Sequence, residues 1–182
     1  MLKYFFISFF VFLLTSANAT SNKKIIKRLE DTNNLNFKFE QNINGKIEKG
    51  NCTIEYPKKI FCKYSGNERK ILVSNARSLV IKTNSSYYRY PLAKTPLNFI
   101  LDKNFLINKI SNLKERIIEK AYINYTIIEN NNEVNIFFDN KTFDLIGWQM
   151  EDIYQNLNIT FFSSIKRNQN IMKDLFKLPP QN

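Results

Sequence analysis

The stretch Gly50–Tyr64, GNCTIEYPKKIFCKY, has the pattern of a β-hairpin. Apolar and polar residues alternate on both sides of a Pro-Lys-Lys turn, as they do in strands that bury one face. If Ile54 faces Ile60 across the turn, Cys52 must face Cys62, because both pairs are centred on the same point of the sequence. Directly opposed residues have Cβ atoms roughly 4.5–5.5 Å apart, which is close to disulfide range. The hairpin therefore brings the two cysteines together on its apolar face, either as a disulfide or as two small buried side chains.

Composition excludes several classes of function. The chain has 182 residues, of which 43% are hydrophobic and 24% charged, as in a globular protein. Histidine is absent, which removes the usual general base and the commonest metal ligand. Two cysteines exclude a Cys-rich zinc site, and four glycines argue against a glycine-rich phosphate loop. We expect no catalytic residue, metal or cofactor, although a glycosidase-type pair of carboxylates needs no histidine and stays open.

The formal net charge is +11, but the lysines and arginines are scattered along the chain. A basic surface can attract nucleic acid or an anionic membrane. The aromatic and basic run 87–90, YYRY, resembles a nucleic-acid-binding surface, but we favour an ordinary strand with Tyr88 and Tyr90 facing the core. We interpret the charge as a solvated basic face and expect no nucleic-acid partner.

The first 19 residues have the three regions of a secretory signal peptide. A positive start ending at Lys3 precedes an apolar run of 11 residues, 4–14, and the segment closes with Ala17-Asn18-Ala19. The run is shorter than the roughly 20 residues that span a membrane. We expect cleavage after Ala19, a single domain over residues 20–182, and export. Because thiols outside the cytosol tend to be oxidised, we predict the Cys52–Cys62 disulfide.

The rest of the chain reads as one helix followed mostly by strands. A helix is predicted from about residue 22 to 32, a short helix after Pro96, and a weaker helical stretch between residues 105 and 120. Gly147 is expected to mark a bulge. The expected strands cover residues 35–40, 52–56, 60–64, 70–74, 78–83, 87–90, 123–128, 134–138, 143–150 and 157–161. Consecutive short strands predict a strongly curved antiparallel sheet or open barrel with a few helices packed on it. Large residues on one strand face could line a hydrophobic cavity instead of a filled core.

In their order along the chain, these features resemble the LolA family of periplasmic lipoprotein carriers. The strand 37–41, FKFEQ, is similar to the family's F-x-Q strand, and Gly50–Tyr64 is similar to its proline-containing hairpin. The segment 95–101 matches T-P-x-x-x-L-L, residues 143–162 resemble the paired strands that follow, and residues 170–179 match the terminal N-x…F-x-x-P pattern. The family usually has arginine before the hairpin proline, whereas this chain has Tyr56.

The resemblance implies a mainly β fold: an open β-barrel of about eleven strands with helices as a lid over a cavity for lipoprotein acyl chains. It implies an inner-membrane Lol ABC transporter as donor and an outer-membrane receptor as acceptor, and it implies that the protein is a periplasmic monomer. The receptor is itself lipidated, so the lack of a cysteine near the cleavage site favours the carrier. A lipid-binding or lipoprotein-sensing protein of the same fold, and a secreted carboxylate hydrolase, are the alternatives.

Strand parity gives the residues expected in such a site. The expected cavity residues are Phe37, Phe39, Ile54, Tyr64, Tyr88, Ile127, Phe137, Trp148 and Ile159. The expected lid residues are Ile26 and Leu29 of the first helix and Leu97, Ile100 and Leu101 of the segment 95–101.

Overall fold

The structure, a computed structural model, describes residues 21–152 and 154–181. The expected signal peptide, residues 1–19, lies outside the described residues, and its cleavage stays a prediction. No helix in the described part of the chain is both long and apolar enough to span a membrane.

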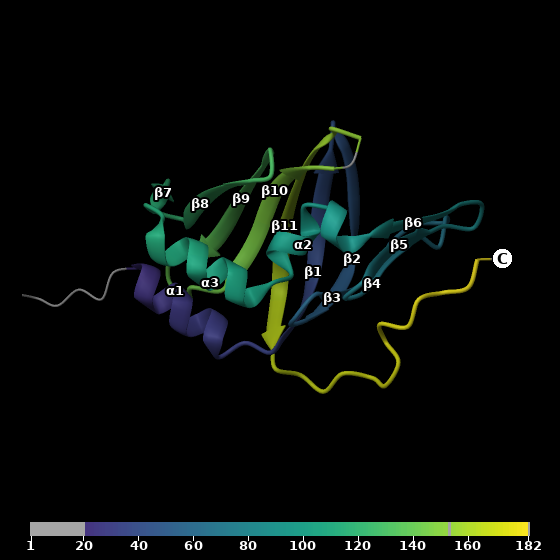
Figure 1. Ribbon diagram of the computed structural model, residues 1–182, viewed down its shortest axis with the longest axis horizontal. Helices are drawn as coiled ribbons and strands as arrows, with labels where there is room; N and C mark the ends of the chain where they lie inside the picture. The colour runs from purple at the N-terminus through teal and green to yellow at the C-terminus, as the bar shows by residue number, and fades with distance from the viewer. Residues whose placement is uncertain (1–20, 153, 182) are drawn as a thin grey trace, which may run out of the picture.

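Eleven strands in the described residues form one antiparallel sheet that does not close (Figure 1). Its order is β6-β5-β4-β3-β2-β1-β11-β10-β9-β8-β7, so β6 and β7 are its two edges. The strands are β1 (Asn34–Ile43), β2 (Lys46–Glu55), β3 (Lys59–Tyr64), β4 (Ile71–Asn75), β5 (Ser78–Lys82), β6 (Tyr87–Pro91), β7 (Arg116–Ile118), β8 (Tyr122–Glu129), β9 (Asn132–Asp139), β10 (Leu145–Glu151) and β11 (Leu157–Arg167). The predicted open antiparallel sheet is confirmed.

The helices pack on one face of this sheet (Figure 1). They are α1 (Ser21–Glu30), the 3₁₀ turn η1 (Leu92–Lys94), α2 (Leu97–Ile100) and α3 (Lys103–Asn112). Asp102 caps α3 by accepting a hydrogen bond from the Phe105 N–H at 3.1 Å. The helical stretch expected up to residue 120 was wrong in its second half, because residues 116–118 pair with β8 as strand β7. A strand partner distant in sequence thus overrides a weak local helical pattern.

Strand register follows the alternation that the sequence predicts. In β2 and β3, Ile54 pairs with Ile60 and Cys52 with Cys62. The register between β9 and β10 shifts next to Gly147, as expected of a bulge. Inward side chains of the strands and the apolar faces of the helices together make one buried core.

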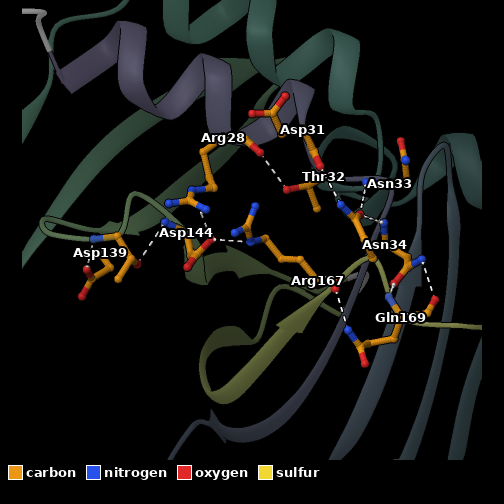
Figure 2. Close-up of polar contacts among 11 residues, drawn as sticks. Arg28, Asp31, Thr32, Asn33, Asn34, Asp139, Asp144, Arg167 and Gln169 are labelled. Carbon is orange, nitrogen blue, oxygen red and sulfur yellow. Dashed lines mark hydrogen bonds and ion pairs between the residues drawn. The ribbon is translucent and has the colours of Figure 1, made fainter.

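A polar network fixes α1 to the end of the sheet (Figure 2). Asp144, in the loop before β10, forms ion pairs with two arginines: its Oδ1 lies 3.5 Å from Arg28 Nε of α1 and 3.2 Å from Arg167 Nε of β11. Asn168 continues the network, because its Nδ2 donates to the carbonyl of Asp31 at 2.8 Å. One carboxylate therefore joins the first helix to the last strand.

Candidate ligand pocket

A pocket of about 490 Å³ opens on the inner face of the sheet. Its walls come from β1–β6 on one side and from β10 and β11 on the other, and the segment from Thr95 to Leu97 covers it. The volume lies within the roughly 300–1,000 Å³ typical of small-molecule sites. Its apolar floor is made mainly by Phe39, Ile60, Leu72, Leu79, Ile81, Trp148 and Met150.

One glycine makes room for the aromatic part of the floor. Gly50 lies opposite Phe39, and a Cβ at position 50 would lie 2.7 Å from the Cε1 atom of that ring. The ring of Phe39 packs against Tyr64 in an edge arrangement with centroids 5.0 Å apart. Gly50 therefore lets a large ring lie flat on the sheet at the base of the pocket.

The cysteine pair forms part of the wall. In the structure Cys52 and Cys62 form a disulfide with Cα atoms 4.1 Å apart, and both residues line the pocket. They are almost fully buried. The pair thus lies on the apolar face that the hairpin pattern of Gly50–Tyr64 predicts.

A charged cluster lies at one end of this mostly apolar pocket. Glu48 accepts from Lys70 Nζ at 2.6 Å and from Lys46 Nζ at 3.3 Å. Burial raises the pKa of Glu48, but the hydrogen bonds and charges of the two lysines outweigh burial and hold that pKa below its ordinary value of 4.5. Lys70 also lies over the ring of Tyr64, with Nζ 4.2 Å from the centroid, and Tyr64 donates to Gln41 Oε1 at 3.2 Å. Burial, followed by the charge of Glu48, raises the pKa of the Tyr64 hydroxyl.

Sequence reasoning missed this cluster, although its signal was present. Lys46 and Glu48 have the same strand parity as Cys52 and so point to the same face. Charged residues at inward positions of a strand indicate either that this end of the strand is solvated or that it belongs to a binding site.

Besides the two cysteines, the structure brings five of the expected cavity and lid residues to this pocket. Phe39, Tyr64, Tyr88 and Trp148 line it from the strands, and Leu97 lines it from α2. Tyr88 is 49% exposed, so it lies at the rim and not in the floor.

Three expected cavity residues lie in the packed core instead. Ile54 and Ile127 are almost completely buried and are absent from the pocket lining. Phe37 stacks on Phe162 with ring centroids 3.9 Å apart, which fills its side of the sheet. Parity places all three on the inner face correctly, but neighbouring side chains fill the space there.

Two further expectations need correction, because the side chains point to the opposite face. Phe137 stacks on Phe161 with centroids 5.2 Å apart, outside the core formed by its neighbours on β9. Ile159 lies between Asn158 and Thr160, and those two residues line the pocket. Both strands have apolar residues on both faces, so apolar parity alone cannot tell which face is inward.

The two lid candidates differ in position. On α1, Leu29 is buried in the core and Ile26 packs partly against it, and neither lines the pocket. On the other segment Leu97 reaches the pocket, whereas Ile100 and Leu101 are fully buried and do not line it. The cover over the pocket is therefore the segment around α2.

The hairpin turn between β2 and β3 holds that cover. The Lys58 N–H donates to the carbonyl of Leu101 at 2.7 Å, and Lys58 Nζ lies 3.3 Å from Asp102 Oδ2. Tyr56, which precedes the turn proline, has a buried hydroxyl without a hydrogen-bond partner among the described residues. Lys58 thus makes the polar contacts between the turn and the cover.

Comparison with known proteins agrees with this architecture. The family model "Outer membrane lipoprotein carrier protein LolA" matches residues 30–179, a range that contains every described strand. The chain belongs to the LolA family. No curated protein matches it.

Solved structures place this LolA-family chain among similar folds. An uncharacterized conserved protein from Thermus thermophilus superposes with a TM-score of 0.53 at 8% identity, over 89% of this chain and 96% of that one. A LolA superfamily protein from Nitrosomonas europaea gives a TM-score of 0.42 at 10% identity, over 88% of this chain and 99% of that one. The first likeness supports the same open-barrel fold.

Proposed function

We propose that residues 20–182 act as a monomeric periplasmic carrier of acylated lipoproteins. The carrier would accept them from the inner-membrane Lol ABC transporter and deliver them to an outer-membrane receptor. The observation that supports this most directly is the covered, apolar-floored pocket of about 490 Å³ in a chain of the LolA family. Such transport needs no catalytic residue, metal or cofactor.

The energetics of transport favour a pocket of this kind. Every methylene group exposed to water costs about 0.8 kcal/mol, so a free acyl chain cannot cross an aqueous space unaided. An apolar floor removes most of that cost. Release, however, requires that the cover can move. The four-residue helix α2, attached to Lys58 of the hairpin turn, suits this role better than α1, which the Asp144 network fixes to the sheet.

Uptake from membranes tests the proposal. Purified mature protein is incubated with spheroplasts that carry a triacylated lipoprotein, and the soluble fraction is separated by gel filtration and identified by mass spectrometry. We expect a soluble one-to-one complex. Tyr88→Asp and Leu97→Asp should reduce its yield, because each places a charge in the pocket lining.

Met172→Asp is the matched control, since Met172 is 74% exposed and lies away from the pocket lining. Circular dichroism melting shows whether each variant is folded. If folded Tyr88→Asp protein carries as much lipoprotein as Met172→Asp protein, or if wild-type protein releases none, the carrier proposal is wrong. Soluble acyl lipid without lipoprotein would instead indicate a lipid-binding protein of the same fold.

A further inference from the structure

Two side-chain amides in the pocket lining keep unused hydrogen-bond donors. Gln41 of β1 is 7% exposed and Asn158 of β11 is 8% exposed, and both line the pocket. The oxygen of each amide is engaged within the protein. Tyr64 donates to Gln41 Oε1 at 3.2 Å, and Thr160 Oγ1 donates to Asn158 Oδ1 at 3.0 Å. The nitrogens, Gln41 Nε2 and Asn158 Nδ2, form no hydrogen bond with any residue in the described part of the chain.

Both amide nitrogens are open to the pocket. Neither belongs to the side-chain atoms of the described residues that are closed off from solvent without a partner. Each side chain is more than nine-tenths buried, so the opening that reaches its nitrogen is the pocket that the residue lines. Buried donors normally have a hydrogen-bond partner, because leaving one unpaired costs free energy. Two such donors in one pocket therefore point to an acceptor group on a ligand.

Strand register places the two amides next to each other. Gln41 pairs with Thr160 of β11, and Asn158 precedes Thr160 by two residues on the same face of the strand. Diagonal neighbours of this kind lie roughly 7–8 Å apart, within reach of long side chains. A carbonyl oxygen has two lone pairs and can accept from two donors. One carbonyl between the amides can therefore receive a hydrogen bond from each.

The charges around the amides favour an acceptor without charge. Glu48 is the cross-strand partner of Gln41 on β2, and its pKa below 4.5 keeps it ionised at neutral pH. The two lysines of the described lining, Lys46 and Lys70, are both paired with this carboxylate. The other acidic residues of the lining are Glu68, Glu151 and Asp152. Carboxylates thus outnumber lysines around the pocket, which disfavours a carboxylate or phosphate on the ligand.

From the two free donors and the surrounding charges we infer that Gln41 and Asn158 form a subsite for an uncharged carbonyl oxygen, the ester or amide linkage of an acylated ligand. The inference rests on the proposed function and names the chemical group that determines its specificity. The two amides would make the pocket prefer an acyl group in ester or amide linkage to a free fatty acid, whose carboxylate would meet the negative lining.

The experiment compares lipids that differ only at the linkage. They are glyceryl monopalmitate, which has an ester, the corresponding amide, and 1-O-hexadecylglycerol, an ether without a carbonyl; palmitate supplies an anionic head. Each lipid is titrated into the oxidised mature protein while the fluorescence of Trp148 is followed, since Trp148 is the only tryptophan of the chain and lines the pocket. We expect the ester or the amide to bind about tenfold more tightly than the ether, because a neutral hydrogen bond contributes roughly twofold to tenfold. Palmitate should bind more weakly than the preferred carbonyl lipid, and the tighter of ester and amide identifies the linkage.

Two nearly isosteric variants test the amides themselves. Gln41→Glu and Asn158→Asp keep the oxygen that accepts from Tyr64 or Thr160 but replace the donor nitrogen by an oxygen. Each should lower the preference for the carbonyl lipid over the ether by about threefold, because each removes one hydrogen bond. A general disturbance of the pocket would weaken both uncharged lipids alike and leave this ratio unchanged. Asn42→Asp is the matched control, since Asn42 is exposed on the opposite face of β1 and its variant should keep the wild-type ratio.

Several results would overturn the inference. They are equal affinity of the wild-type protein for the ester, the amide and the ether, tighter binding of palmitate, or no binding of any of these lipids. A folded Gln41→Glu or Asn158→Asp protein with the wild-type ratio would also overturn it, and circular dichroism melting shows which variants are folded. The carrier proposal is decided separately by lipoprotein release from spheroplasts, which does not depend on what fixes the linkage.

Discussion

Reduction of the Cys52–Cys62 disulfide should destabilise the protein by an amount that the structure allows us to calculate. The two cysteines are ten residues apart in sequence, so the bond closes a short loop. The loop-entropy relation gives about 2.7 kcal/mol for a loop of about 11 residues. Both side chains are almost fully buried and can stay in place as small apolar thiols, so packing should change little on reduction. Loop entropy should therefore account for most of the loss.

Urea unfolding of the mature protein, followed by far-UV circular dichroism with and without a phosphine reductant, measures this loss directly. A thermal melt provides a second measurement: for a chain of this size, a loss of about 2.7 kcal/mol corresponds to a fall in Tm of roughly 5–10 °C. The double variant Cys52→Ala/Cys62→Ala is the control, because its unfolding midpoint should not respond to reductant. Mass analysis without reductant should show the loss of two hydrogens in wild-type protein.

Two results would refute the reasoning. Free thiols at both positions in protein isolated from an oxidising compartment would show that the bond does not form. An unchanged unfolding midpoint after complete reduction, verified by thiol titration, would show that closing this loop does not stabilise the native state.

Three other substitutions test the packing and charges described above. Asp144→Ala should lower the free energy of unfolding by about 1–2 kcal/mol in urea melts, because two partly exposed arginines lose their shared carboxylate. Gly147→Ala should cost about 1–3 kcal/mol in the same assay, since a Cβ there would lie 3.1 Å from the Phe161 ring and closer still to the backbone; an unchanged midpoint would contradict this tight approach. The pKa of Glu48 is lower in the folded than in the unfolded chain, so its contribution to stability is present above pH 4.5 and is lost as the pH falls below that value. Glu48→Gln should therefore flatten the acid side of a stability-against-pH curve, and a curve as steep as that of wild type would refute this.

The sequence determined the local geometry of this protein to a large extent. The hairpin Gly50–Tyr64 specifies its own register, because its alternation leaves only one pairing that buries Ile54, Ile60 and both cysteines together. The strand beginning at Leu35 is equally clear, since its apolar residues occupy one parity only. Such patterns depend on residues close together in the chain, and they sufficed to predict an open antiparallel sheet with helices packed on it.

Which side chains line the pocket was decided only by the tertiary structure. Phe39 lines the pocket, while Phe37, two residues earlier on the same face, is covered by Phe162 of β11, and no property of the two phenylalanines distinguishes them. Phe137 was misplaced because β9 is apolar on both faces. Strand parity tells which face a side chain shares, but a cavity exists only where curvature and the covering helix leave that face unfilled. That depends on strands and helices far apart in sequence, as the contact between Lys58 and Leu101 shows.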